Sequence, residues 1–307
     1  MKVFITGATG YIGSAVALEL DENGHEVLAL ARSDEAAETL GDEGYQVVRG
    51  DLRDTDLLKE YAEQADGIIH AGFEPSEEGG AVDAAAVEAY LEALTGTEKP
   101  LIYTSGVWVY GTTGNDPVDE EDALDPIPLV AWRVPVEERL VAAAPDVRTV
   151  VLRPALVYGR AGGIPAMLTF SAAEHNAVRF VGGGGNKWTM VHVGDLADLY
   201  RLALEAVATG TLEPGTVLNA AHDVPVTVRE AAEAASYGAG TEGAVRSWPL
   251  EEAQQELGGV ADALVLNQVV SGEKAKRLLE WRPEAPYDLL TDLRSGSYAH
   301  AAQQAAW

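Results

Sequence analysis

The sequence predicts an α/β fold in which a doubly wound parallel sheet is joined to a smaller C-terminal lobe. Two observations support this prediction. The first 155 residues alternate short segments rich in Val, Ile and Leu with helix-like segments over short connections, as a parallel sheet covered on both faces does. A glycine-rich run, Thr6-Gly7-Ala8-Thr9-Gly10-Tyr11-Ile12-Gly13, lies directly between the first apolar segment and the first helix-like one.

Six strands are expected before residue 155. The apolar segments that define them are Lys2–Thr6, Glu26–Ala31, Tyr45–Gly50, Gly67–Ala71, Pro100–Ser105 and Arg148–Arg153. Helices are expected between these strands at Tyr11–Asn23, Asp34–Asp42, Asp54–Gln64, Ala81–Thr95 and Pro135–Ala144. Gly24 follows the first helix, where a left-handed C-terminal cap belongs.

The alternation loosens beyond Arg153. An apolar helix is expected near Ile164–Asn176, and a strand is expected near Val217–Ala220. Thr227 and Glu230 then have the spacing of a capping box, which predicts that a helix begins there.

The three glycines of the opening run, Gly7, Gly10 and Gly13, have the spacing of a Rossmann-type dinucleotide-binding turn. Glycine permits a tight turn and a close approach of the backbone to a pyrophosphate. The helix that follows aims its N-terminal N–H groups at that charge. We therefore predict that these glycines bind a dinucleotide, together with Thr9, Tyr11 and Ile12.

This prediction assigns roles to the two parts of the chain. Residues 1–155, with about 190–220, are expected to form the dinucleotide-binding Rossmann domain. Residues of about 156–189 and 221–307 are expected to form a smaller substrate-binding lobe. The two parts are interleaved in the sequence.

The end of the second strand bears on the choice of cofactor. Arg32 and Ser33 stand where an NAD-selective site places an acidic residue, and arginine suits the 2′-phosphate of NADP instead. NADP is therefore the predicted cofactor. Asp34 and Glu35 follow so closely that NAD stays open.

Two further dipeptides are expected to contact the cofactor. Asp51-Leu52, after the third strand, would flank the adenine. Ala71-Gly72, after the fourth strand, would let the cofactor pass close to the backbone.

Composition excludes several classes of function. The 49 acidic residues outnumber the 21 basic ones, and a net charge of −28 repels nucleic acid and anionic membrane surfaces. The absence of cysteine excludes disulfides, thiol catalysis and thiolate metal sites, and the six histidines are too scattered for a metal site. No apolar run reaches the roughly 20 residues of a membrane span, and no leader precedes the glycine run, so a cytoplasmic location is expected.

The acidity has two readings. One is an acid-rich surface of an ordinary soluble protein. The other is adaptation to molar salt, which screens the self-repulsion of such a surface, and the scarcity of lysine (six residues) favours this halophilic reading.

Four landmarks resemble the extended and atypical short-chain dehydrogenase/reductase superfamily, which includes sugar-nucleotide epimerases and dehydratases. They are the glycine run and the stretches 102–111 (IYTSGVWVYG), 152–159 (LRPALVYG) and 191–197 (VHVGDLA). The resemblance covers nearly the whole chain. It implies that Thr104, Ser105, Pro154 and Val157 lie at the cofactor, and that a homodimer through two helices flanking the active site is possible.

The catalytic residues that this resemblance implies are not present. Gly106 stands where the superfamily has a serine or threonine, and Val130 and Val134 stand at the positions of its Tyr-x-x-x-Lys pair. Pro135 disfavours helix in the residue before it, so the active-site helix is expected to start late. Residues Leu129–Val134 would then form a loop or a distorted turn.

Three side chains are candidates to replace the missing set. Tyr110 is a possible proton donor, although a tyrosine in this place also serves packing. Ser105 is a possible hydrogen-bond partner of the substrate or of the nicotinamide amide. Arg133 is a possible electrophilic cation, and the alternative for it is a surface salt bridge to Glu137.

The leading functional hypothesis is an NADP(H)-dependent oxidoreductase that acts on a small carbonyl or hydroxyl compound through a non-standard proton donor. A redox sensor that binds the dinucleotide without catalysis is the alternative, because it needs the glycine turn but no catalytic tyrosine. A redox-neutral epimerase or isomerase is the third hypothesis. No motif identifies the substrate.

Overall fold

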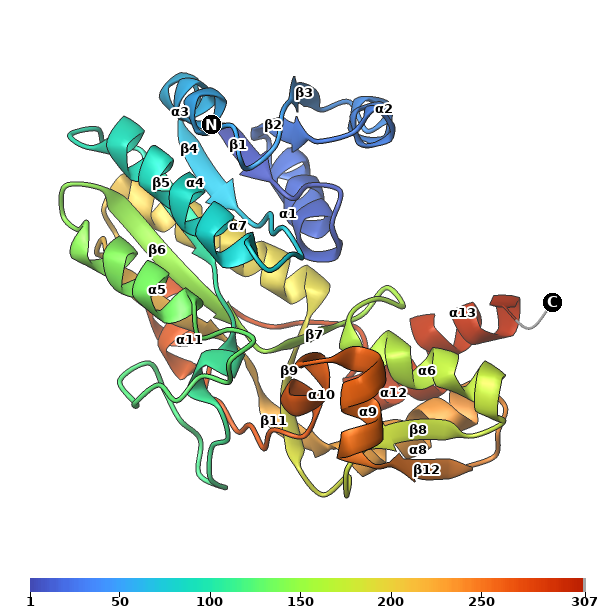
Figure 1. Cartoon of the computed structure of the whole chain (residues 1–307). Helices are drawn as coiled ribbons and strands as arrows, with labels where there is room; N and C mark the ends of the chain where they lie inside the picture. The colour runs from blue at the N-terminus through green and yellow to red at the C-terminus, as the bar shows by residue number, and fades with distance from the viewer. Residues whose placement is uncertain (306–307) are drawn as a thin grey trace.

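The computed structural model describes residues 1–305, apart from the side chains at 173, 174, 223 and 305, and it confirms the predicted α/β fold (Figure 1). The strands of the central sheet are β1 (Lys2–Thr6), β2 (Glu26–Ala31), β3 (Gln46–Arg49), β4 (Gly67–His70), β5 (Pro100–Thr104), β6 (Arg148–Pro154) and β10 (Thr216–Ala220). All seven are parallel, in the order β10-β6-β5-β4-β1-β2-β3. The strand order reverses between β1 and β4, and ligands of doubly wound sheets bind at such a point.

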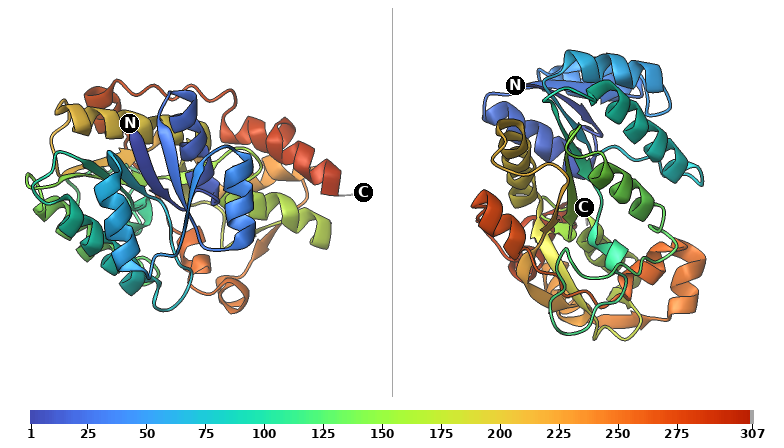
Figure 2. Two further views of the ribbon diagram at one scale, coloured as in Figure 1. Left: turned by 90° about the horizontal axis from the view of Figure 1, so that it is seen from above. Right: turned by 90° about the vertical axis from the view of Figure 1, so that its left-hand side faces the viewer.

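Helices cover both faces of this sheet (Figures 1 and 2). One face carries α1 (Tyr11–Glu22), α2 (Asp34–Asp42), α7 (Val193–Thr209) and α11 (Glu273–Leu279). The other face carries α3 (Thr55–Gln64), α4 (Gly79–Leu94) and α5 (Arg133–Ala142). Strand β1 shows why the sheet is apolar throughout, since Val3 and Ile5 pack into the first layer while Phe4 packs into the second.

The smaller part of the molecule lies beside the carboxyl edge of the large sheet (Figure 1). It contains a three-stranded sheet of β7 (Leu156–Tyr158), β9 (Lys187–His192) and β11 (His222–Thr227), and a parallel pair of β8 (Val178–Val181) and β12 (Val245–Trp248). Its helices are α6 (Ile164–His175), α8 (Val228–Gly238), α9 (Leu250–Leu257), α10 (Val260–Leu264), α12 (Leu289–Ser295) and α13 (Ser297–Ala305). No helix within residues 1–305 is long and apolar enough to cross a membrane.

Several local predictions are confirmed. The strands β1 and β2 and the helix α2 have the predicted bounds. Gly24 has a φ of +80° after α1, as a left-handed cap requires. Thr227 and Glu230 form the predicted capping box at the start of α8.

The late start that was predicted for the helix at Pro135 is wrong by two residues. The segment forms turns as far as Trp132, and α5 begins at Arg133. Pro135 is therefore the third residue of α5, within the first turn, where its missing N–H costs no hydrogen bond inside the helix. Other predicted bounds differ by one or two residues, as at β3 and α4.

A histidine cap starts the helix that returns from the smaller part to the large sheet. The Nδ1 atom of His192 accepts a hydrogen bond from the N–H of Gly194 at 3.1 Å, at the start of α7. The same ring lies edge-on to Tyr158, with 5.2 Å between the ring centroids. Burial lowers the pKa of His192 below its ordinary 6.5, so the neutral ring that the cap requires is favoured.

Candidate functional site

The glycine turn lies at the carboxyl end of β1 and is closely packed. Gly7 has a φ of +77°, and its carbonyl accepts a hydrogen bond from the N–H of Gly10 at 2.8 Å. A Cβ atom on Gly13 would lie 2.1 Å from the carbonyl oxygen of Gly7, so only glycine lets α1 approach the turn this closely. The structure therefore has the compact cradle that a pyrophosphate requires at a helix N-terminus.

A groove of about 400 Å³ runs from this turn along the ends of β2, β3 and β4. Nine of the residues predicted to bind the cofactor line it: Gly7, Thr9, Gly10, Arg32, Ser33, Asp51, Leu52, Ala71 and Gly72. Phe73 and Glu74 also line the groove and were missed by the sequence analysis, because no motif marks the segment after β4.

An ion-pair cluster borders the groove on the segment after β4. The guanidinium of Arg53 donates two hydrogen bonds to the carboxylate of Glu74, at 2.6 and 2.9 Å, and one to Glu78 at 2.9 Å. These bonds, more than the charge of nearby Arg32, lower the pKa of Glu74 to about 2. The cluster ties the segment that carries Phe73 to the turn that follows β3.

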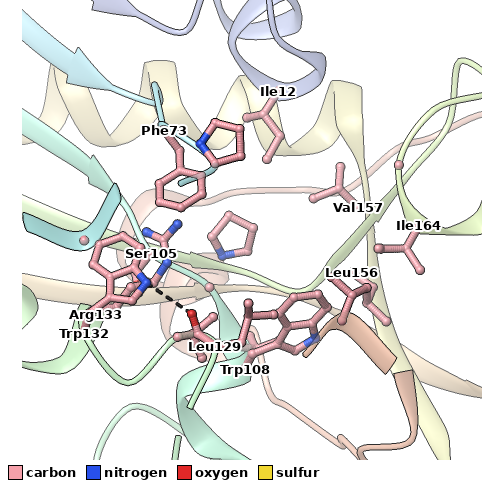
Figure 3. Close-up of a pocket in the computed structure, with 18 of the residues that line it drawn as sticks. Ile12, Phe73, Ser105, Trp108, Leu129, Trp132, Arg133, Leu156, Val157 and Ile164 are labelled. Atoms are coloured by element: carbon pink, nitrogen blue, oxygen red, sulfur yellow. Dashed lines mark hydrogen bonds between the residues drawn. The ribbon is translucent and has the colours of Figure 1, made fainter. Parts of the chain in front are cut away.

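A deeper cleft of about 970 Å³ lies next to the groove, and Phe73 lines both. Most of its wall is apolar, as Figure 3 shows. The apolar residues include Ile12, Trp108, Leu129, Val130, Trp132, Leu156, Val157, Ile164 and Val260. Five residues predicted to bind the cofactor line this cleft and not the groove: Tyr11, Ile12, Ser105, Pro154 and Val157.

An aromatic stack with a cation forms one wall of the cleft (Figure 3). The rings of Phe73 and Trp132 are nearly parallel, with centroids 5.5 Å apart. The guanidinium of Arg133 lies 4.4 Å from the centroid of Trp132 and 5.7 Å from that of Phe73. Its Nη1 atom donates to the carbonyl of Thr104 at 2.7 Å, which fixes a positive charge beside an apolar space.

A buried chain of hydrogen bonds lies behind Ser105. The hydroxyl of Ser105 donates to Oε1 of Glu137, and the carboxylate of Glu137 also accepts from Nε of Arg153 at 3.0 Å and from Nη2 at 2.5 Å. Arg153 in turn donates to the hydroxyl of Tyr110 at 2.7 Å, and that hydroxyl donates to Asn219 at 3.0 Å. The predicted surface salt bridge between Arg133 and Glu137 is therefore wrong, because the carboxylate is buried against Arg153.

Three predicted residues do not line either space. The hydroxyl of Thr104 forms a hydrogen bond with the hydroxyl of Tyr200 at 2.6 Å. Gly13 lies against the glycine turn, where a Cβ atom would meet the carbonyl of Gly7. Tyr110 is 3 % exposed and lies in the core beneath Arg153, and burial raises the pKa of its hydroxyl to about 12. This placement argues against Tyr110 as the proton donor.

Val130 and Val134 stand where the resemblance implies a tyrosine and a lysine, and both have apolar surroundings in the structure. Val130 lines the cleft, and Val134 packs against the large core. Gly106 also lines the cleft. Among the side chains that the structure describes, no group of three or more His, Asp or Glu has the arrangement of a metal site.

These features define a Rossmann-type protein with a glycine turn, a groove along the carboxyl ends of the strands, and a cleft beside the smaller part. The chain belongs to the NAD dependent epimerase/dehydratase family, whose family model matches residues 3–221. Proteins of this family are NAD(P)-dependent, so a role in oxidoreductase or epimerase-like chemistry follows from the membership.

The relatives found by sequence and by structure agree with this assignment. The chain is 34% identical to the uncharacterized protein YLL056C of Saccharomyces cerevisiae, over 96% of this chain and 98% of that protein. It is 28% identical to a 2-alkyl-3-oxoalkanoate reductase of Stenotrophomonas maltophilia, over 75% of this chain and 73% of that enzyme. The dTDP-glucose 4,6-dehydratase of Bacillus anthracis in complex with NAD has the same fold, with a TM-score of 0.82, 18% identity, and coverage of 100% of this chain and 98% of that one.

Proposed function

We propose that the protein is an NADP(H)-dependent oxidoreductase that acts on a small carbonyl or hydroxyl compound with an apolar body. One observation carries the proposal: a groove lined by the glycine turn lies next to an apolar cleft that is lined by Ser105 and Arg133, and Phe73 lines both. The reductase of Stenotrophomonas maltophilia supports it, because its name specifies a keto substrate with an alkyl part.

The cofactor half of the proposal depends on the groove. The packing of Gly13 against Gly7 leaves a cradle that fits a pyrophosphate, and Arg32 and Ser33 line the far end of the groove. Arg32 is exposed and carries the charge that a 2′-phosphate requires. When bound, the nicotinamide would supply or accept the hydride.

The substrate half depends on the cleft. Arg133 is the only basic residue among the described residues that line it. A nucleotide sugar carries a pyrophosphate that needs several basic partners. An apolar wall with one cation instead favours a compound with a single polar oxygen, held by Arg133 and Ser105 against the stack of Phe73 and Trp132.

The proposal is tested by following NADPH absorbance and fluorescence in concentrated KCl with alkyl and aromatic aldehydes and ketones, and with the matching alcohols and NADP⁺. NADH and a nucleotide sugar are the controls. Turnover of an apolar compound with NADPH supports the proposal. Enhanced fluorescence without consumption of any compound contradicts it and favours the redox sensor, which would need the groove but no reaction in the cleft.

The remaining expectations belong to this proposal. The enzyme would work in the cytoplasm, with no nucleic-acid or membrane partner, and the acidic surface would be an adaptation to salt. The resemblance makes a homodimer possible, and light scattering of the purified protein would test it.

A further inference from the structure

The hydrogen bond from Ser105 to Glu137 determines whether the serine hydroxyl can donate to a ligand or accept from it. A hydroxyl has one proton to donate, and that of Ser105 is donated to the carboxylate of Glu137. Ser105 itself lines the cleft. In this arrangement it accepts a hydrogen bond from a ligand and cannot donate one.

Arg133 lines the same cleft and supplies hydrogen-bond donors there. Arg133 and Glu137 are four residues apart on α5 and so share one face of the helix, yet they take different partners. Nη1 of Arg133 donates to the carbonyl of Thr104 at 2.7 Å and to the hydroxyl of Tyr103 at 3.3 Å, while the described residues show no hydrogen bond from its Nε and Nη2 groups. A guanidinium donates only. A ligand hydroxyl therefore satisfies both neighbours, because it accepts from Arg133 and donates to Ser105.

The carboxylate of Glu137 is built into the interior as one half of an ion pair. Its side chain is 3% exposed and that of Arg153 is 6% exposed, with the contacts at 2.5 and 3.0 Å described above. A buried carboxylate stays ionised only when it is paired in this way. Glu137 is thus a charged proton acceptor that reaches the cleft only through the hydroxyl of Ser105.

From this geometry we infer that Glu137 is the proton acceptor for alcohol oxidation in the cleft, with Ser105 as the relay. The inference rests on the proposed function. When bound, the oxidised dinucleotide would accept the hydride of the substrate C–H as the C–O bond becomes C=O. The substrate O–H proton passes to Oγ of Ser105, whose own proton passes to Oε1 of Glu137, which becomes neutral. In reduction the same protons move in the opposite direction, and Arg133 stabilises the negative charge on oxygen.

The charged and titratable groups near Glu137 are two arginines and two tyrosines. Arg153 of β6 contacts it directly, and Arg133 lies on the same helix. Tyr103 of β5 and Tyr110 are the tyrosines nearby, and burial raises the pKa of both hydroxyls above their ordinary 10.0. The rate of oxidation should therefore fall in acid as Glu137 takes up a proton, and neither tyrosine contributes to that decline.

The test compares E137Q and S105A with the wild type in steady-state alcohol oxidation across pH. Glutamine keeps the acceptor at Oε1 but takes up no proton, so we expect kcat to fall by about 100-fold or more. We also expect the decline of the rate in acid to disappear. S105A leaves the contacts between Glu137 and Arg153 intact. The decline of the rate in acid should disappear in S105A as well, because the carboxylate of Glu137 no longer has a hydroxyl through which to exchange a proton with the substrate.

One carboxylate of the same helix serves as the matched control. Glu138 is the next residue of α5, is exposed, and does not line the cleft. E138Q should keep kcat within about twofold of the wild type, a change of less than 1 kcal/mol. A readout without cofactor is the infrared absorption of the buried carboxylate in wild type and S105A. S105A removes the hydrogen bond from Ser105 to Glu137, so the carboxylate band should shift in frequency.

The outcomes separate this inference from the proposed function. No turnover by the wild type in either direction overturns both. Turnover that E137Q and S105A leave within about twofold of the wild type overturns the relay alone. An unchanged carboxylate band in S105A also overturns it. If E137Q does not fold, the kinetics and the infrared spectrum of S105A decide the question.

Discussion

Replacing Gly13 by alanine adds a methyl group where two backbone segments touch. The new Cβ atom would lie 2.1 Å from the carbonyl oxygen of Gly7 and 2.6 Å from its carbonyl carbon. Contacts below 3.0 Å are essentially never seen for a Cβ atom, so the turn and α1 must separate by about 0.9 Å. Both partners are backbone, and no side chain can rotate away to absorb the change.

The separation should affect stability and binding together. Overpacking of this kind costs about 1–3 kcal/mol of the free energy of unfolding. The N–H groups of the turn move with it, and a loss of about 1.4 kcal/mol in binding would weaken the affinity for NADPH about tenfold. We therefore expect G13A to unfold at lower urea concentration and to bind NADPH at least about tenfold more weakly.

Urea denaturation and fluorescence titration with NADPH measure the two effects. The matched control is G41A, because Gly41 lies in α2 and a Cβ atom there meets nothing within 4 Å. This control should gain up to about 1 kcal/mol of stability from helix propensity and bind NADPH normally. If G13A bound NADPH as tightly as G41A does, the tight packing of the glycine turn would not be what positions the dinucleotide.

Three further predictions concern the cofactor, one histidine and the surface charge. R32A should raise the Kd for NADPH about tenfold and leave that for NADH unchanged, since one hydrogen-bonded charge is lost. The pKa of His192 is 6.5 in the unfolded chain and lower in the folded protein, so the wild type should lose stability as pH falls between these two values, because the native state keeps the ring neutral. H192N should lose less stability over this range, since its amide oxygen can still cap α7. With a net charge of −28, thermal unfolding should occur at higher temperature in molar KCl than in dilute buffer.

Controls make these three predictions decisive. For R32A, equal loss of NADPH and NADH affinity would show that Arg32 does not read the 2′-phosphate. Asp195 lies near His192, and burial raises the pKa of its carboxyl. The stability that Asp195 contributes is therefore lost as pH rises, which is opposite to the effect of His192. Parallel stability curves for wild type and H192N below pH 6.5 would contradict the cap argument. Equal stability in KCl and dilute buffer would remove the halophilic interpretation.

The large sheet was predictable because its signals are local. Apolar segments of strand length, bounded by turn residues, placed β1 and β2 at their observed bounds, and the glycine spacing placed the groove at the end of β1. Pro135 misled the prediction of α5, since the preference against helix before proline is weaker than the packing that starts the helix at Arg133.

The polar groups of the cleft were less predictable because their partners are distant in sequence. One of the two alternatives for Arg133 was a surface salt bridge to Glu137, whereas the partner of Glu137 is Arg153, from the end of β6. Tyr110 follows β5 as a donor would, but the short helical turn at Val107–Tyr110 directs it under Arg153 and into the core. No pattern within one element encodes either contact.

The position of β10 has a consequence for how the chain folds as it is synthesised. This strand pairs with β6, yet about 60 residues that build β7, β8, β9 and α7 separate the two in sequence. At about 5–20 residues per second, several seconds pass between the synthesis of β6 and that of its partner. During that interval β6 presents an unpaired, apolar edge, which is the kind of surface that aggregates. The nascent protein is therefore most vulnerable after the dinucleotide groove is complete and before β10 emerges.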